Sequence, residues 1–294
     1  MARPVPRRAP RHTPTDTKSY NARVSLARAL SKLGVASRAE ARRWILADRV
    51  TVNGRRVTDP ERRVDPDRDR LAVDDGMIAP AQPLYVLMHK PRGVVTTRSD
   101  EAGRRTVYDV LAKADPAAVS EWIFPVGRLD RDSSGVLLMT NDTRWGNRLA
   151  SPDSHVPKTY HVRVRPPILA QDLDRLTAGA VLAAGPTRPL AAVVVRQSPR
   201  GSWIEVTLTE GKNRQIRRLC ARLGYRVETL VRIRVGDVAL GTLQPGEVRR
   251  LTPDEVRGLA GGAITSRSRP AGGTSGSPQR RRWSSARRAF LGRK

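Results

Sequence analysis

The sequence predicts an α+β protein, in which a small N-terminal module precedes one larger domain. Near the N-terminus, two short amphipathic helical patterns are followed by short strand-like runs. Farther along, strand-like runs outnumber helical ones, so neighbouring strands should be largely antiparallel. A chain of 294 residues with 38% hydrophobic content can supply a core for each part.

The first module begins with two predicted helices. Leu26 and Leu30 share one helix face, and Gly34 follows at a position where a left-handed residue commonly ends a helix. Ser37 and Glu40 have the spacing of a capping box, which predicts a second helix through residues 44–46.

Short strands should complete this module, which we place at residues 23–76. Residues 50–52 lead into Asn53-Gly54, the signal of a type I′ hairpin turn. Val57 and residues 71–73 are expected to form the strands that pair back on this one. Two short helices and a small sheet with a basic face are typical of a compact RNA-binding module. The expected RNA-contacting residues are Arg28, Lys32, Arg38, Arg42, Arg43 and Arg49.

The larger domain should span residues 84–256, after a linker at 77–83. It opens on an apolar run at 84–88 that is typical of a buried strand. Further strands are predicted at 136–139, 160–164, 181–183, 191–195 and 203–208, and helices at 169–176 and 214–223.

Both ends of the chain are basic and lack an apolar period, so residues 1–22 and 257–294 should be disordered. Such segments add salt-dependent affinity for RNA phosphates. An Arg-rich organelle transit peptide is the alternative for the first segment. The basic residues of the first segment are Arg3, Arg7, Arg8, Arg11 and Lys18.

The formal charge of +27 favours a polyanionic partner, either a nucleic acid or an anionic membrane. No run of 18 apolar residues and no signal-peptide pattern are present, and a membrane-surface protein would need an amphipathic helix. Cys220 is the only cysteine, which excludes an intramolecular disulfide and favours a reducing cytosol. Neither metal-ligand spacing nor a phosphate-binding glycine motif occurs, so we expect no metal and no cofactor.

Residues 124–142 carry the strongest candidate for chemistry. Pro and Gly residues punctuate this stretch, and a short apolar strand follows, so that Asp130 should project from a turn anchored by a rigid strand. The acidic spacing also imitates the start of a calcium loop, but Asn141 stands where that loop requires Glu. A solvated surface turn without chemistry is the other alternative.

Four motifs, in order, resemble those of the pseudouridine synthases, specifically the RsuA/RluB/RluE/RluF family that modifies bacterial ribosomal RNA. They are Lys90-Pro91-Arg92-Gly93-Val94-Val95-Thr96-Thr97, Gly127-Arg128-Leu129-Asp130 followed by Ser134-Gly135-Val136-Leu137-Leu138, Lys158-Thr159-Tyr160, and Glu210-Gly211-Lys212-Asn213-Arg214-Gln215-Ile216-Arg217-Arg218-Leu219. Residues 37–45 and 49–54 likewise resemble the S4 RNA-binding domain. The resemblance covers about residues 23–255.

The resemblance implies a long, curved mixed sheet around a central cleft, in which a uridine is flipped out of the RNA and isomerised without a cofactor. Asp130 would be the catalytic carboxylate. Arg217 would pair with Asp130, because a carboxylate buried beneath a base keeps its charge only beside a cation, with a phosphate contact from the start of a helix as the alternative. Tyr160 would stack on the base and take the C5 proton, with an ordinary core tyrosine as the alternative.

The remaining implied contacts are with the substrate. Leu230 resembles the aliphatic floor of the base pocket. Basic and amide residues of the motifs would hold phosphates and the nucleotide. They are Lys90, Arg128, Lys212, Asn213, Arg214 and Arg218.

The sequence therefore predicts a monomeric, cytoplasmic ribosomal RNA pseudouridine synthase. The motifs look more like the branch that modifies the large ribosomal subunit. Its partner would be ribosomal RNA or a ribosomal assembly intermediate, with neither DNA nor a membrane involved. A noncatalytic RNA-binding or ribosome-assembly protein that keeps the fold is the competing class. The target uridine, and the choice between a covalent and a glycal pathway, do not follow from the sequence.

Overall fold

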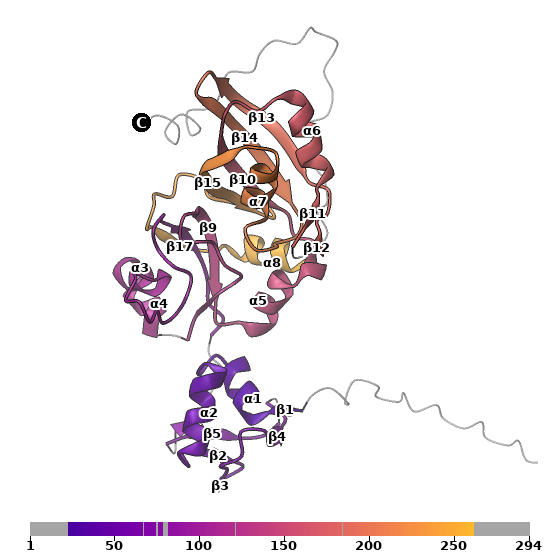
Figure 1. The fold of residues 1–294 in the computed structure, drawn as a ribbon. Coiled ribbons are helices and arrows are strands. Elements are labelled where there is room, and N and C mark those ends of the chain that lie inside the picture. Colours follow the sequence, from indigo (N-terminus) through magenta and orange to yellow (C-terminus); the bar gives the residue numbers. More distant parts are fainter. Residues whose placement is uncertain are drawn as a thin grey trace, which may run out of the picture. The chain divides into compact units, whose positions relative to one another are not determined.

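The computed structural model describes residues 23–261, apart from 67, 75, 79–81, 121 and 184. The chain divides into two compact units, residues 1–80 and 81–294 (Figure 1). The predicted basic arm at 1–22 lies outside the described residues. So does the predicted tail beyond residue 261.

The first unit contains the two predicted helices. Ser37 caps the second helix by accepting a hydrogen bond from the Glu40 N–H at 2.9 Å, and Gly34 is left-handed after the first helix, with φ +73°. Asn53 and Gly54 have φ of +53° and +79°, as a type I′ turn requires. The elements are β1 (Val24–Ser25), α1 (Leu26–Lys32), α2 (Arg38–Leu46), β2 (Val50–Val52), β3 (Arg55–Arg56), β4 (Arg63–Val64), β5 (Leu71–Val73) and β6 (Gly76–Met77).

A single apolar core holds this unit together. Leu26, Leu30 and Ile45 are fully buried there against valines of the four-stranded sheet β3-β2-β5-β6. Strand β6 pairs with β5, and Ile78 packs on the same core, so the unit continues beyond residue 76.

The second unit is built on a nine-stranded sheet, whose main path is β13-β14-β10-β15-β9-β7-β17 (Figure 1). All its pairs are antiparallel except β9 with β15, which confirms a mixed, mainly antiparallel α+β domain. The strands are β7 (Tyr85–Lys90), β8 (Phe124–Pro125), β9 (Ser134–Thr140), β10 (Lys158–Arg165), β13 (Ala191–Ser198), β14 (Gly201–Leu208), β15 (Arg226–Val235), β16 (Val238–Ala239) and β17 (Val248–Arg250).

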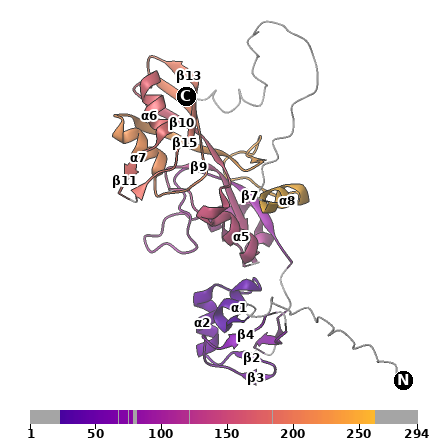
Figure 2. The ribbon, with the colours of Figure 1, turned by 90° about the vertical axis from the view of Figure 1, so that its right-hand side faces the viewer.

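Helices and a small hairpin surround this sheet, and α6 and α7 lie on the same side of the strands near β13 (Figure 2). Three apolar clusters fill the spaces between helices and strands. The remaining elements are α3 (Val107–Ala114), α4 (Pro116–Ser120), α5 (Thr143–Ala150), the 3₁₀ helix η1 (Pro152–Ser154), α6 (Ala170–Ala178), β11 (Val181–Leu182), β12 (Gly185–Pro186), α7 (Gln215–Arg222) and α8 (Pro253–Gly261).

The predicted start of the C-terminal tail at residue 257 is wrong. Helix α8 continues to Gly261 and buries Leu259 to 3% exposure in the cluster that also contains Trp145. The sequence did not predict this helix to its end, because Gly258, a poor helix former, interrupts its apolar pattern.

Strands β9 and β15 join the two halves of the sheet over two register pairs, Ser134 with Val231 and Gly135 with Arg232. Gly135 has φ +106°, and a Cβ there would lie 2.1 Å from the carbonyl oxygen of Arg232. Only glycine permits this approach of the two backbones.

We therefore expect Gly135→Ala to lower the midpoint of thermal unfolding sharply, because the methyl group must push β9 away from β15. Gly258→Ala is the matched control, since a Cβ there meets nothing within 4 Å. That change should leave the midpoint equal or slightly higher. Calorimetry on both variants tests this, and equal midpoints for Gly135→Ala and the wild type would contradict it.

Candidate active site

The loop between β8 and β9 carries Asp130, as predicted, and a second segment supports it. The Thr96 hydroxyl donates to the carbonyl of Leu129 at 2.8 Å, and the Gly93 N–H donates to that of Arg131 at 2.7 Å. Within the loop, the Ser133 N–H donates to the Asp130 carbonyl at 3.0 Å. Residues of the motif that begins at Lys90 thus hold the backbone of the loop that carries Asp130.

Lys90 completes this support, and its predicted contact with substrate is wrong. Its side chain is 0% exposed, and Nζ donates to the carbonyls of Pro91, Asp130 and Ser133 at 3.0, 3.1 and 2.9 Å. Burial lowers the pKa of this ammonium to about 8, although the carboxylates of Asp130 and Asp132 oppose that shift. Lys90 sits at the end of a buried strand, so its side chain points into the protein and organises the loop from below.

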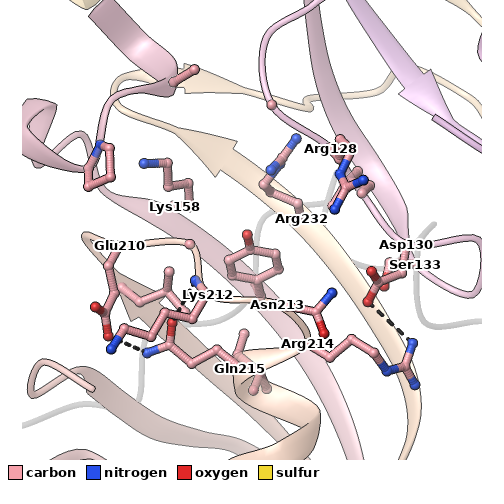
Figure 3. A pocket seen from close by; sticks show the side chains of 18 of the residues that line it. Arg128, Asp130, Ser133, Lys158, Glu210, Lys212, Asn213, Arg214, Gln215 and Arg232 are labelled. Carbon is pink, nitrogen blue, oxygen red and sulfur yellow. Dashed lines mark hydrogen bonds and ion pairs between the residues drawn. The ribbon is translucent and has the colours of Figure 1, made fainter. Parts of the chain in front are cut away.

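The ion pair of Asp130 is formed with Arg214 and not with the predicted Arg217. Nη1 of Arg214 lies 3.4 Å from Oδ2 of Asp130 (Figure 3), and the two side chains are 43% and 32% exposed. Arg214 precedes α7 in a left-handed conformation, with φ +50° and ψ +34°. Its side chain therefore does not follow the direction that a helical residue at this position would have. That conformation could not be read from the motif.

Arg217 lies behind the loop, on the first turn of α7. Its Nη2 donates to the carbonyl of Asp132 and its Nη1 to that of Val227, each at 3.1 Å. Its Nε is buried without a partner among the described residues. Desolvation lowers its pKa, while Asp130 and Asp132 oppose the shift. Arg217 therefore fixes the loop and β15 relative to α7, close to Asp130 but without pairing to it.

A cavity of about 350 Å³ opens beside Asp130, within the size range of small-ligand pockets. Tyr160 and Leu230, predicted to hold the base, both line it, as do Arg128, Lys212 and Asn213. Leu230 is 7% exposed. The structure thus brings Asp130, Tyr160 and Leu230 to one pocket, from the β8–β9 loop, β10 and β15.

Three cations follow one side of this pocket, namely Lys158, Arg232 and Arg128 (Figure 3). Burial, reinforced by the neighbouring Arg232, lowers the pKa of Lys158 to about 8. Arg232 is 6% exposed and donates from Nε to the carbonyl of Val136 at 2.7 Å. Within the part of the chain that the structure describes, none of the three has a carboxylate partner, so this wall can accept an anion.

The opposite side is polar and internally bonded. Gln215 donates to the buried Glu210 carboxylate at 2.6 Å, and Glu210 also accepts from the Arg188 N–H at 2.8 Å. The ammonium of Lys212 is directed to the carbonyl of Pro186. Arg218 does not line the cavity and instead donates to Asn213 Oδ1 at 2.9 Å.

The other reactive residue types lie away from this cavity. Histidines 89, 155 and 161 do not line it, and burial raises the pKa of the Cys220 thiol to about 12. Over the described residues, no group of three His, Cys, Asp or Glu side chains is arranged to hold a metal ion. No helix there is both long and apolar enough to cross a membrane.

Comparison with known proteins now identifies the family. Residues 84–222 match the model of RNA pseudouridylate synthases, and residues 24–69 match the S4 domain. An uncharacterized RNA pseudouridine synthase of Mycobacterium tuberculosis is 39% identical over 241 residues, which are 79% of this chain and 91% of that protein. The chain belongs to the RNA pseudouridine synthase family.

Two further relatives agree with this assignment. The Bacillus subtilis ribosomal large subunit pseudouridine synthase B is 35% identical over 236 residues, covering 80% of this chain and 94% of that protein. A crystal structure of a pseudouridylate synthase aligns with this synthase at 28% sequence identity and a TM-score of 0.58. The alignment covers 80% of this chain and 99% of that one.

Sequence reasoning missed two pocket residues of this pseudouridine synthase, Lys158 and Arg232. A signal was present, because successive side chains of a strand alternate between its faces. Lys158 lies two residues before Tyr160, and Arg232 two residues after Leu230, so each shares the face of a residue already assigned to the pocket.

Replacing Lys90 with Met should slow the reaction of this synthase without weakening RNA binding. Methionine matches the length of lysine but removes one donor from each of three carbonyls, of which that of Asp130 keeps the Ser133 N–H; each carbonyl left unsatisfied costs about 1–3 kcal/mol. We expect a lower unfolding midpoint and a single-turnover rate at least about tenfold lower at saturating RNA.

Lys113→Met is the control, because this exposed lysine of α3 lies outside the loop network. It removes one positive charge and should change neither quantity. A Lys90→Met enzyme with the wild-type rate and midpoint would show that the loop does not depend on Lys90.

Proposed function

We propose that this chain converts a specific uridine of ribosomal RNA to pseudouridine, with Asp130 as the catalytic carboxylate. The observation that carries the proposal is the convergence of Asp130, Tyr160 and Leu230 on one nucleotide-sized cavity beside an unneutralised cationic wall. The large ribosomal subunit is favoured as the source of the substrate, because the Bacillus subtilis relative bears that name. One buried cysteine suits a reducing compartment such as the cytoplasm.

The reaction breaks the bond between N1 and C1′ of the nucleoside and forms a bond between C5 and C1′. The proton on C5 must leave, and N1 must gain one, so the reaction needs neither an oxidant nor water. A carboxylate can act covalently or assist departure of the base and then accept the proton. Asp130 is the carboxylate of the pocket that lies within reach of solvent, whereas Glu210 is 8% exposed and bonded to its neighbours.

Tyr160 and Leu230 would hold the flipped base. Register pairing places Tyr160 opposite Arg232 and Val162 opposite Leu230, so the ring and the aliphatic side chain come from adjacent strands on one face. An aromatic face and an apolar floor suit a uracil removed from its stack. Arg214 would hold the Asp130 carboxylate in position before the substrate arrives.

Lys158, Arg232 and Arg128 would bind the phosphates that flank the target nucleotide. Phosphate contacts of this kind fix the register of the RNA, while the pocket selects the base. Because the partly buried ammonium of Lys158 lacks an anionic partner among the described residues, binding a phosphate relieves the repulsion between Lys158 and Arg232.

The N-terminal unit would supply a second, separate RNA contact. Of its six predicted basic residues, Arg28, Arg38 and Arg42 line one hollow. Arg49 does not line this hollow; it pairs with Asp74 and lies over the ring of Trp44, 5.5 Å from its centroid. Within the hollow, Arg42 lies 3.4 Å from the carboxylate of Glu61, and both side chains are largely exposed. We assign the RNA contact to the first three residues.

The competing proposal is a noncatalytic RNA-binding protein that keeps the fold. It gives no reason for a tyrosine, an aliphatic floor and a paired carboxylate to meet in one cavity. Loss of catalysis with retention of binding after a single change at Asp130 distinguishes the two.

Asp130→Asn should abolish pseudouridine formation while RNA affinity stays within a few-fold of the wild type, because one neutralised acid changes little on so basic a chain. Mapping of pseudouridine in ribosomal RNA, together with a binding isotherm, tests both halves. Asp132→Asn is the matched control, since it neutralises a carboxylate two residues away that does not line the cavity. If Asp130→Asn retains turnover, or if both variants lose it equally, the assignment fails.

The pH dependence of binding should report on Lys158. Its pKa is lowered to about 8, so the ammonium is charged below that pH and neutral above it. The KM for RNA should therefore rise by roughly tenfold as the pH passes from 7 to 9.5, the value of one charge-assisted contact of about 1.5 kcal/mol. Lys158→Arg keeps its charge and should flatten this dependence. An identical pH profile for both enzymes would exclude Lys158 as the phosphate ligand.

A further inference from the structure

The sheet of the second unit has a face that the catalytic proposal leaves unused. Along β10, Tyr160, Val162 and Val164 belong to the pocket or to the core cluster beneath α6 and α7. The alternate residues His161, Arg163 and Arg165 lie on the other face. Strand β14 alternates in the same way, with buried Ile204 and Val206 on the core side. We call the region around Trp203, Arg163, Arg165, Arg196 and Arg226 the outer face.

Trp203 lies at the centre of the outer face. In the register of the sheet it stands directly opposite Arg163 of β10 on one side and Arg196 of β13 on the other. It is partly exposed, and among the described residues it belongs to none of the four apolar clusters. A large aromatic ring that supports no core and lies between two arginines is positioned to meet a ligand.

The charges around Trp203 are predominantly positive. Arg165 stands opposite Arg226, so that four arginines surround two glutamates. Glu228 is shared between Nε of Arg163 at 3.1 Å and Nε of Arg165 at 2.9 Å. The second glutamate, Glu205, is bonded to His161 Nε2 at 3.0 Å.

Glu228 also restricts the positions of Arg163 and Arg165. Glu228 lies within ion-pair distance of both Arg163 and Arg165, and each guanidinium carries five N–H donors, so one carboxylate cannot occupy the donors of both groups. Arg165 has 47% of its side chain exposed, and Arg196 is exposed on the edge strand. The outer face thus combines a stacking surface with oriented cationic donors.

We propose that the outer face binds an unpaired stretch of the RNA substrate, with one base stacked on Trp203 and its flanking phosphates held by Arg163 and Arg196. An aromatic ring on an open sheet, bordered by basic residues, suits single-stranded RNA because every base offers a π-face to stack. Tryptophan and arginine are also enriched at interfaces between proteins, so the excess of positive charge on the outer face and on the whole chain is what favours an anionic partner. The proposal rests on RNA binding by the family and is independent of the assignment of Asp130.

Binding of a 12-nucleotide RNA made of adenosines and cytidines to the full chain tests this proposal. The probe lacks uridine, so failure of the catalytic assignment cannot affect the result. Trp203→Ala should weaken binding by about fivefold or more, as expected for the loss of one stacked base. Trp203→Phe retains an aromatic face and should recover most of that loss.

The arginines are tested through the salt dependence of the same binding. Arg196→Gln should reduce the slope of log Kd against log salt by about one, as expected for the loss of one phosphate contact. Arg257→Gln on α8 removes the same charge from a different, exposed site and is the matched control. It should leave the slope unchanged.

Wild-type affinity for Trp203→Ala and a wild-type salt slope for Arg196→Gln would overturn the proposal, and would leave the outer face to a protein partner. So would an equal loss for the alanine and phenylalanine variants, since stacking predicts that phenylalanine is better. An equal change of slope for Arg196→Gln and Arg257→Gln would reduce the effect to overall charge and would equally overturn it. Unfolding midpoints near that of the wild type establish that each variant is folded.

Discussion

The close approach of the Gly135 and Arg232 backbones is the constraint on which the arrangement of the active site depends. It joins β9, which follows the Asp130 loop, to β15, which carries Leu230 and Arg232. These strands meet in parallel over two register pairs, so the acid and the floor of the pocket come from segments about a hundred residues apart in sequence. A side chain at position 135 would separate the chemistry from the surface that holds the base.

Charged side chains then position the Asp130 carboxylate and the loop that carries it. A single ion pair fixes the Asp130 carboxylate to Arg214, while Arg217 and Lys90 hold the backbone of the same loop by donating to its carbonyls. Cations thus serve two separate purposes here, since one orients the reactive group and the others immobilise the peptide that carries it. Lys158 and Arg232 differ from these, because neither has a carboxylate partner among the described residues, although Arg232 also donates to the Val136 carbonyl of β9.

Much of this structure could be predicted from the sequence, because local signals and motifs agree. The Asn53-Gly54 turn requires two left-handed residues, and the buried strand after Asp130 follows from an apolar run, so both were predictable. Strand β15 was not predicted as a strand, although it is 10 residues long. Its charged residues alternate with apolar ones only in part, and its first four residues, 226–229, are not buried.

The partners of individual side chains were less predictable than the elements. A motif gives the order of Arg214, Arg217 and Arg218 but not the left-handed conformation that turns the first of them toward Asp130. Likewise, Lys90 was expected to contact the substrate because it lies in the first motif, whereas the length of β7 carries its ammonium beneath the loop. Such contacts depend on tertiary geometry, which spacing along the chain does not contain.

The solitary cysteine has a practical consequence for following RNA arrival. Cys220 is 1% exposed within the core beneath α7, and a thiol whose pKa is about 12 is almost entirely protonated at neutral pH. Thiol-reactive dyes attack the thiolate, so they should pass over this side chain. A cysteine introduced at the hairpin between β13 and β14 would then take up a fluorophore selectively, without any change to the native core.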